Sequence, residues 1–128
     1  MKSKTLLLLT LTILGCSALS RNQEPAWFPA KIVMIEKEYA NIDTDLTAPQ
    51  LATKGITQGS MFNVKYKNHQ MTALLGKDYG DVDKGKWIAL IEKEGNLQIA
   101  ISFGHAATEI GCAAGDTIYL QAAPPENN

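Results

Sequence analysis

Few residues in this chain combine the types and the spacing that chemistry requires. His69 and His105 lie far apart, and neither has a cysteine or carboxylate at metal-ligand spacing. Asp81 and Asp83 stand beside Gly80, where turn hydrogen bonds explain them. We find no Ser/His/Asp arrangement, no phosphate-binding glycine loop and no helix with paired metal ligands. We therefore predict no catalytic residue, no metal and no cofactor, with both histidines at the surface or hydrogen-bonded.

Two tyrosines, Tyr39 and Tyr79, are the remaining candidates for ligand contact. Each flanks a predicted turn, and aromatic residues are favoured in strands and at barrel ends. From the residues alone two interpretations stay open. The rings belong to the core or rim, or they form the platform of a binding site.

The chain around these tyrosines has the pattern of short β-strands separated by turns. We predict strands at residues 31–35, 41–46, 62–66, 71–75, 87–91, 97–103 and 117–121. The proline- and glycine-containing segment 47–60 is predicted as loop, with room for a helical turn at 50–54. A short helix is predicted at 105–110.

The segment 79–107 is the clearest local signal, because it reads as a β-hairpin. Gly95 lies in its turn and can adopt a positive φ without a side-chain clash. Alternation puts four apolar side chains on one face of the second strand, which is predicted to be the core face: Leu97, Ile99, Ile101 and Phe103. The other face carries Gln98, Ala100 and Ser102.

These elements predict an all-β fold, a small and mostly antiparallel β-barrel of six or seven strands with one short helix near 105–110. A flat sheet of this size would leave its edges open. The domain is predicted at residues 30–122, and residues 123–128 form a tail predicted to be disordered.

Residues 1–15 are predicted to be a lipoprotein signal peptide. Lys2 and Lys4 precede an apolar run, and a small residue stands before Cys16, as in a bacterial lipobox. Cys16 would then carry the lipid and anchor the protein in the cell envelope, with Ser17 favouring the outer membrane facing the periplasm. An uncleaved anchor and a signal peptide cut after Ala18 are the alternatives.

Residues 16–29 are predicted to be a spacer between the membrane and the domain. Trp27 and Phe28 in this spacer either cover an open end of the barrel or touch the bilayer interface. Cys112 is predicted to be a small buried hydrophobe. The net charge of -1 gives no electrostatic reason to expect a nucleic-acid partner.

A set of motifs between residues 79 and 118 resembles the C-terminal β-barrel domain of the S-adenosylmethionine hydroxide adenosyltransferases and related halogenases. The matching residues are Tyr79-Gly80-Asp81-Val82, Gly85, Gly95, Leu97-Gln98-Ile99-Ala100, Gly104, Ala106-Ala107 and Gly115-Asp116-Thr117-Ile118. The resemblance covers roughly the last two-thirds of the chain, and it implies the same barrel fold.

The resemblance also implies a ligand site, since in this family the barrel forms one wall of a nucleoside pocket. It places Tyr39 and Asn41 facing the nucleoside, Tyr79 stacking on adenine, and backbone groups of Ile101 and Phe103 at the adenine edge. The family's catalytic groups come from an N-terminal α/β domain that has no counterpart in this sequence. Its serine-rich turn for the methionine end reads Lys93-Glu94 here, which is a departure.

Three functions from different classes follow. We expect a non-catalytic, lipid-anchored module that binds a protein partner or self-associates in the cell envelope. The alternative is a weak binder of adenosine or S-adenosylmethionine through Tyr39, Asn41 and Tyr79. The third is part of an S-adenosylmethionine-cleaving enzyme that needs a partner catalytic domain.

Overall fold

The computed structural model describes residues 23–124. The predictions about the signal peptide, Cys16 and residues 125–128 of the tail lie outside this range. The elements are β1 (Phe28–Ile35), β2 (Ile42–Thr47), α1 (Ala48–Thr53), β3 (Met61–Tyr66), β4 (His69–Leu75), the 3-10 helix η2 (Tyr79–Asp81), β5 (Trp87–Ile91), β6 (Asn96–Ile101), α2 (Ala106–Ile110) and β7 (Thr117–Ala122).

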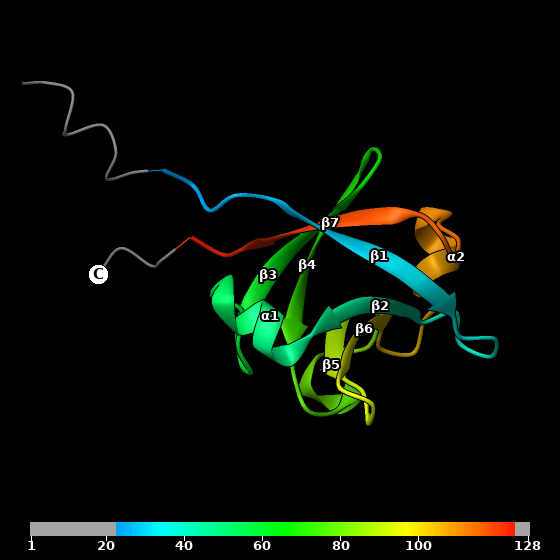
Figure 1. Ribbon diagram of the computed structural model, residues 1–128. Helices are drawn as coiled ribbons and strands as arrows, with labels where there is room; N and C mark the ends of the chain where they lie inside the picture. The colour runs from blue at the N-terminus through cyan, green and yellow to red at the C-terminus, as the bar shows by residue number, and fades with distance from the viewer. Residues whose placement is uncertain (1–22, 125–128) are drawn as a thin grey trace, which may run out of the picture.

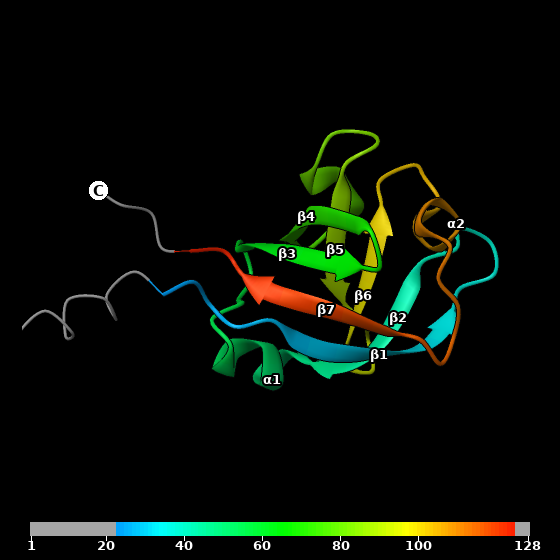
Figure 2. The same cartoon turned by 90° about the horizontal axis from the view of Figure 1, so that it is seen from above.

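The strands form a closed barrel in the order β1-β2-β6-β5-β4-β3-β7 (Figures 1 and 2). All neighbouring pairs are antiparallel except β4 and β5, which are parallel. Alternate side chains fill the interior, and the largest fully buried ones include Phe62, Ile32, Ile99, Ile118 and Leu120. The predicted mostly antiparallel small barrel is therefore confirmed, with seven strands.

The barrel begins earlier than the predicted boundary at residue 30. Phe28, the first residue of β1, pairs with Leu120 of β7 and is buried in the core, so its ring is not free to touch a bilayer. Pro29 is tolerated in β1 because pairing with β2 starts only at Ile32. Trp27 is half-buried, with Lys65 Nζ 4.3 Å from its ring centroid.

The connection between β4 and β5 explains a feature that the sequence pattern misses. Parallel neighbours require a crossover, and residues 76–86 make it over the outer face of β6. Ser102 fixes this crossover: its Oγ donates to the Tyr79 carbonyl at 3.1 Å, and its carbonyl accepts from Gly85 N at 2.8 Å. Both faces of β6 are consequently buried, and the prediction that only one face is core is wrong.

The crossover packs closely enough to form a second apolar layer outside the barrel. Ile88 and Ala100, cross-strand neighbours, are both buried although they lie outside the barrel core. A Cβ on Gly76 would come within 2.8 Å of Asp81 Oδ2 and 2.9 Å of Ile88 Cδ1. The backbone of the crossover is therefore tightly packed at its first residue, Gly76, and the crossover then brings Tyr79 to Gln98 of β6.

The chain turns sharply after β6, two residues before the predicted end of the strand. Gly104 N donates to the Ile101 carbonyl at 3.0 Å, and a Cβ on Gly104 would lie 2.5 Å from Ile101 Cγ2. Phe103, inside this turn, has φ of 58° and is 81% exposed. The prediction that Phe103 shares the core face of the strand is wrong, because the turn ends the alternation.

Both short helices cover the barrel near its ends (Figure 2). α2 confirms the predicted helix at 105–110, and α1 occupies the predicted helical turn at 50–54, extended at its start by a capping box between Thr47 and Gln50. No helix in the described residues is long and apolar enough to cross a membrane.

We expect the stability of the barrel to depend on the charge of Asp116. Tyr66 Oη donates to Asp116 Oδ2 at 2.7 Å and Ala113 N donates to the same oxygen at 2.9 Å. These two bonds hold the pKa of Asp116 below its ordinary value. Since the folded pKa is depressed, this contribution is present above the unfolded pKa of about 3.9 and is lost as pH falls further.

The check is chemical denaturation of wild type and Asp116→Asn at neutral pH and at acid pH. The variant should lose part of the acid sensitivity, and Tyr66→Phe, which removes the stronger bond from the other side, should lose part of it too. Equal acid sensitivity in all three proteins would contradict the assignment.

Candidate functional site

A cleft of about 530 Å³ lies on the outside of the barrel, where the crossover, the β1–β2 turn and the turn after β6 meet. Its wall combines three aromatic rings with two carboxylates and two amides: the lining residues are Glu36, Tyr39, Asn41, Tyr79, Glu92, Gln98, Phe103 and Gly104. The volume falls within the range of ligand sites. The β1–β2 turn contributes Glu36, Tyr39 and Asn41, the crossover contributes Tyr79, and the segment from the β5–β6 turn to the turn after β6 contributes the other lining residues.

A hydrogen-bonded network forms the floor of the cleft. Gln98 Oε1 accepts from Tyr79 Oη at 2.6 Å and from Asn41 Nδ2 at 3.1 Å. Asn41 Nδ2 also donates to Tyr79 Oη at 3.1 Å, and Gln98 Nε2 donates to Asp43 Oδ1 at 2.8 Å. Gln98 and Asn41 are each only 6% exposed, so the network fixes the Tyr79 ring from below.

The three rings differ in how they are held. All three are exposed in part, and Tyr79, the least exposed of them, is also held by the hydrogen bond from its hydroxyl to Gln98. Phe103 adopts a left-handed backbone conformation that bulky residues avoid, and Lys84 Nζ lies 4.7 Å from its ring centroid. An exposed ring in a strained conformation contributes little to folding.

The electrostatic environment of the cleft is negative. Burial raises the pKa of Tyr79, and the charges of Glu92, Glu36 and Asp43 raise it further, against a lowering by the Asn41 hydrogen bond. Burial also raises the pKa of Glu92, followed by the charges of Asp43 and Glu94. No lysine, arginine or histidine of the described residues lines the cleft.

Four of the five predicted ligand residues meet in this cleft: Tyr39, Asn41, Tyr79 and Phe103. Ile101 does not line the cleft, and the carbonyl of this residue, whose backbone was the predicted contact, accepts from Gly104 N at 3.0 Å. Sequence reasoning missed Gln98, Glu36 and Glu92. Two signals were available for Gln98: its position on the second face of the strand, and its place in the family-matching motif Leu97-Gln98-Ile99-Ala100.

The remaining candidates stand apart from this cleft. His69 and His105 are exposed, as expected of surface histidines. In the described part of the chain no three His, Cys, Asp or Glu side chains cluster as metal ligands would. Cys112 is half-buried, and burial raises the pKa of its thiol.

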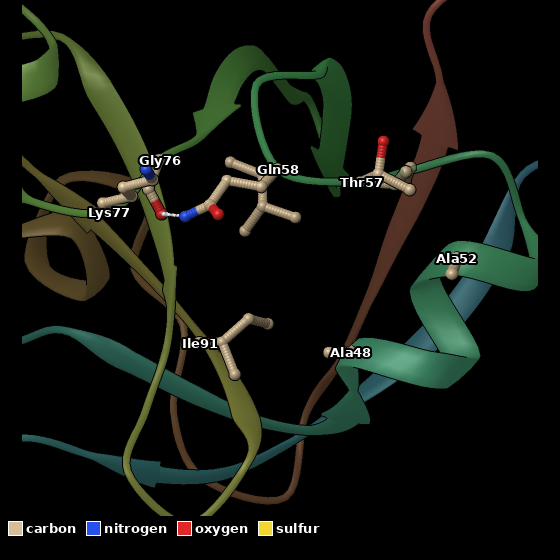
Figure 3. Close-up of a pocket in the computed structure, with 9 residues that line it drawn as sticks. Ala48, Ala52, Thr57, Gln58, Gly76, Lys77 and Ile91 are labelled. Carbon is tan, nitrogen blue, oxygen red and sulfur yellow. Dashed lines mark hydrogen bonds between the residues drawn. The ribbon is translucent and has the colours of Figure 1, made fainter.

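A second cavity of about 450 Å³ lies between α1 and the end of β4 (Figure 3). Gln58 reaches across it to donate to the Gly76 carbonyl at 3.5 Å. Its walls are mostly apolar: Ala48, Ala52, Ile56, Thr57, Gln58, Leu75, Gly76, Lys77 and Ile91. It brings together no set of titratable groups.

The closed seven-stranded barrel with a crossover over one strand defines a small all-β domain with a cleft on its outer face. The sequence model of the family described as the SAM hydroxide adenosyltransferase C-terminal domain matches residues 30–119. The chain therefore belongs to this family.

Solved structures support the same fold. An uncharacterized conserved protein from Thermotoga maritima matches with a TM-score of 0.69 and 19% identity, over 89% of this chain and 42% of the other. A conserved hypothetical protein from Thermus thermophilus matches with a TM-score of 0.52 and 18% identity, over 76% of this chain and 35% of the other. This chain thus spans less than half the length of either. The search of curated proteins gave no match.

Proposed function

We propose that this chain is a non-catalytic binding module, held at the cell envelope by a lipid on Cys16, that binds a protein partner or a second copy of itself. The observation that carries the proposal is Phe103, a large apolar ring left 81% exposed beside an open cleft. Its backbone is strained, and strain of this kind clusters at functional sites.

The polar groups of the cleft favour binding over catalysis. The side chains of Asn41, Tyr79 and Gln98 donate to one another and to Asp43 instead of converging on a point where a substrate atom could sit. Such a network makes a rigid surface. An open cleft with a single wall leaves a ligand partly uncovered, and a partner would supply the second wall.

Site-specific crosslinking in the bacterial envelope tests the partner. A photo-reactive phenylalanine analogue at Phe103 should capture one protein or a second copy of this chain, and Tyr39→Ala should abolish the product. The same analogue at Asn68, an exposed turn residue that does not line the cleft, is the control. Equal crosslinking from both positions, or from neither, would argue against the proposal.

The anchor is tested separately. Mass spectrometry of the N-terminus should find a lipid on Cys16, and Cys16→Ser should move the protein out of the membrane fraction. A mature chain that starts after Ala18 would contradict this part.

A nucleoside is the second candidate ligand, because Tyr39, Asn41, Tyr79 and Phe103 share the cleft wall. With one wall, affinity should be of millimolar order, about 4 kcal/mol. NMR titration with adenosine and with S-adenosylmethionine should then shift the amide signals of these residues. Cleavage of S-adenosylmethionine would further need a catalytic domain as the partner. No shifts at millimolar nucleoside would remove both.

A further inference from the structure

On the cleft floor the side-chain donors of Asn41 and Tyr79 are already used, and the free group is an acceptor. Both N–H groups of Asn41 Nδ2 are used, one by Tyr79 Oη and one by Gln98 Oε1. The Tyr79 hydroxyl proton is used by Gln98. Asn41 Oδ1 has no hydrogen-bond partner in the described residues, although Asn41 is almost fully buried at the cleft wall. The floor therefore offers an acceptor to an incoming ligand.

The two carboxylates of the cleft add further acceptors. Glu36 uses one lone pair of each oxygen to cap its own turn, accepting from Glu38 N at 2.9 Å and Tyr39 N at 2.8 Å. Glu92 is half-buried in the cleft lining, where burial and the charges of Asp43 and Glu94 raise its pKa. A carboxylate in this state gains when a cation binds.

The aromatic rings select the shape of that cation. Tyr39, Tyr79 and Phe103 present exposed ring surface around the acceptors. Aromatic faces attract cations, and Lys84 already lies against the Phe103 ring from a position outside the cleft lining. A planar group that stacks on rings while it donates to carboxylates fits this wall better than a compact ammonium ion does.

We propose that the cleft binds the guanidinium group of an arginine side chain presented by a protein partner, with Glu92, Glu36 and Asn41 Oδ1 as acceptors and the three rings as walls. Guanidinium carries five donors and no acceptor, which matches a surface of free acceptors. The inference rests on the proposed binding function and names the chemistry of the partner.

NMR titration of the full chain with two peptides tests this. Acetyl-Gly-Arg-Gly-amide should shift the amide signals of Tyr79, Glu92 and Phe103, whereas the same peptide with citrulline, which has the shape without the charge, should not. Affinity should fall about tenfold in Glu92→Gln. It should also fall when salt is raised to about 0.5 M, because salt screens the charge pair.

The matched control is Glu94→Gln, which removes an exposed charge from the same hairpin outside the cleft lining. It should bind the arginine peptide nearly as wild type does. Equal binding of arginine and citrulline peptides, or equal loss in both glutamine variants, would overturn the proposal. If crosslinks form through Phe103 while the arginine peptide fails to bind, the inference fails and the binding function stands. If the arginine peptide binds while no crosslinks form, the cleft recognises guanidinium and the proposed binding of a partner in the envelope fails.

Discussion

Gln98→Ala is expected to lower the free energy of unfolding by about 1 to 3 kcal/mol, the cost of leaving the buried Asn41 donor and the part-buried Tyr79 hydroxyl without their acceptor. Gln98 Oε1 is the only acceptor for the Tyr79 hydroxyl among the hydrogen bonds of the described residues, and it also serves Asn41. The loss should be concentrated at the crossover, because Tyr79 Oη anchors that loop to β6. Urea denaturation measures the total, and amide hydrogen exchange at residues 76–86 measures the local part.

Gln58→Ala is the matched control for this experiment. It truncates the same residue type, but Gln58 is exposed and makes a single bond of 3.5 Å. We expect a change within about 0.5 kcal/mol. A double-mutant cycle with Asn41→Ala should show coupling of about 0.5 to 3 kcal/mol. A Gln98→Ala protein as stable as wild type, or with unaltered exchange in the crossover, would show that the network does not hold Tyr79.

The barrel was predictable because its information is local. Phe62, Val64 and Tyr66 alternate with polar residues and are buried on one side, and Gly95 takes the positive φ expected of its turn. The closed sheet followed from many short strands that would otherwise leave open edges. The start of β1 at Phe28 was not predicted because Pro29 follows it. A proline is tolerated in a strand where a neighbouring strand is missing, and β2 does not pair with β1 before Ile32, which the sequence pattern does not reveal.

The candidate site was predictable only in part, because the floor of the cleft depends on contacts between segments that lie far apart in the sequence. Tyr39, Asn41 and Tyr79 were reached through the family resemblance, and they do lie together. Gln98 belongs with them only because the crossover runs over β6 and turns an outer face into a buried one. Alternation along β6 is the same whichever strand the loop covers, so the sequence pattern could not include it.

Phe103→Gly should separate the binding function from folding. Glycine adopts φ of 58° without strain, whereas Phe103 is held there at a cost of about 1 to 2 kcal/mol. Against this stand the greater flexibility of glycine in the unfolded chain and the loss of the contact with Lys84. We expect the free energy of unfolding to stay within about 1 kcal/mol of wild type. Partner binding should weaken about tenfold or more, as for an exposed aromatic anchor.

Phe103→Ala is the control that divides the two effects. It loses the ring but keeps a side chain in the left-handed region, so it should be about 1 kcal/mol less stable than Phe103→Gly and bind the partner equally weakly. Thermal unfolding gives the stabilities, and crosslinking from a photo-reactive residue at Tyr39 gives the binding. If both variants unfold readily, Phe103 supports the fold. If both keep the fold and lose the partner, then the strain at this turn exists because it displays an aromatic ring at the edge of the cleft.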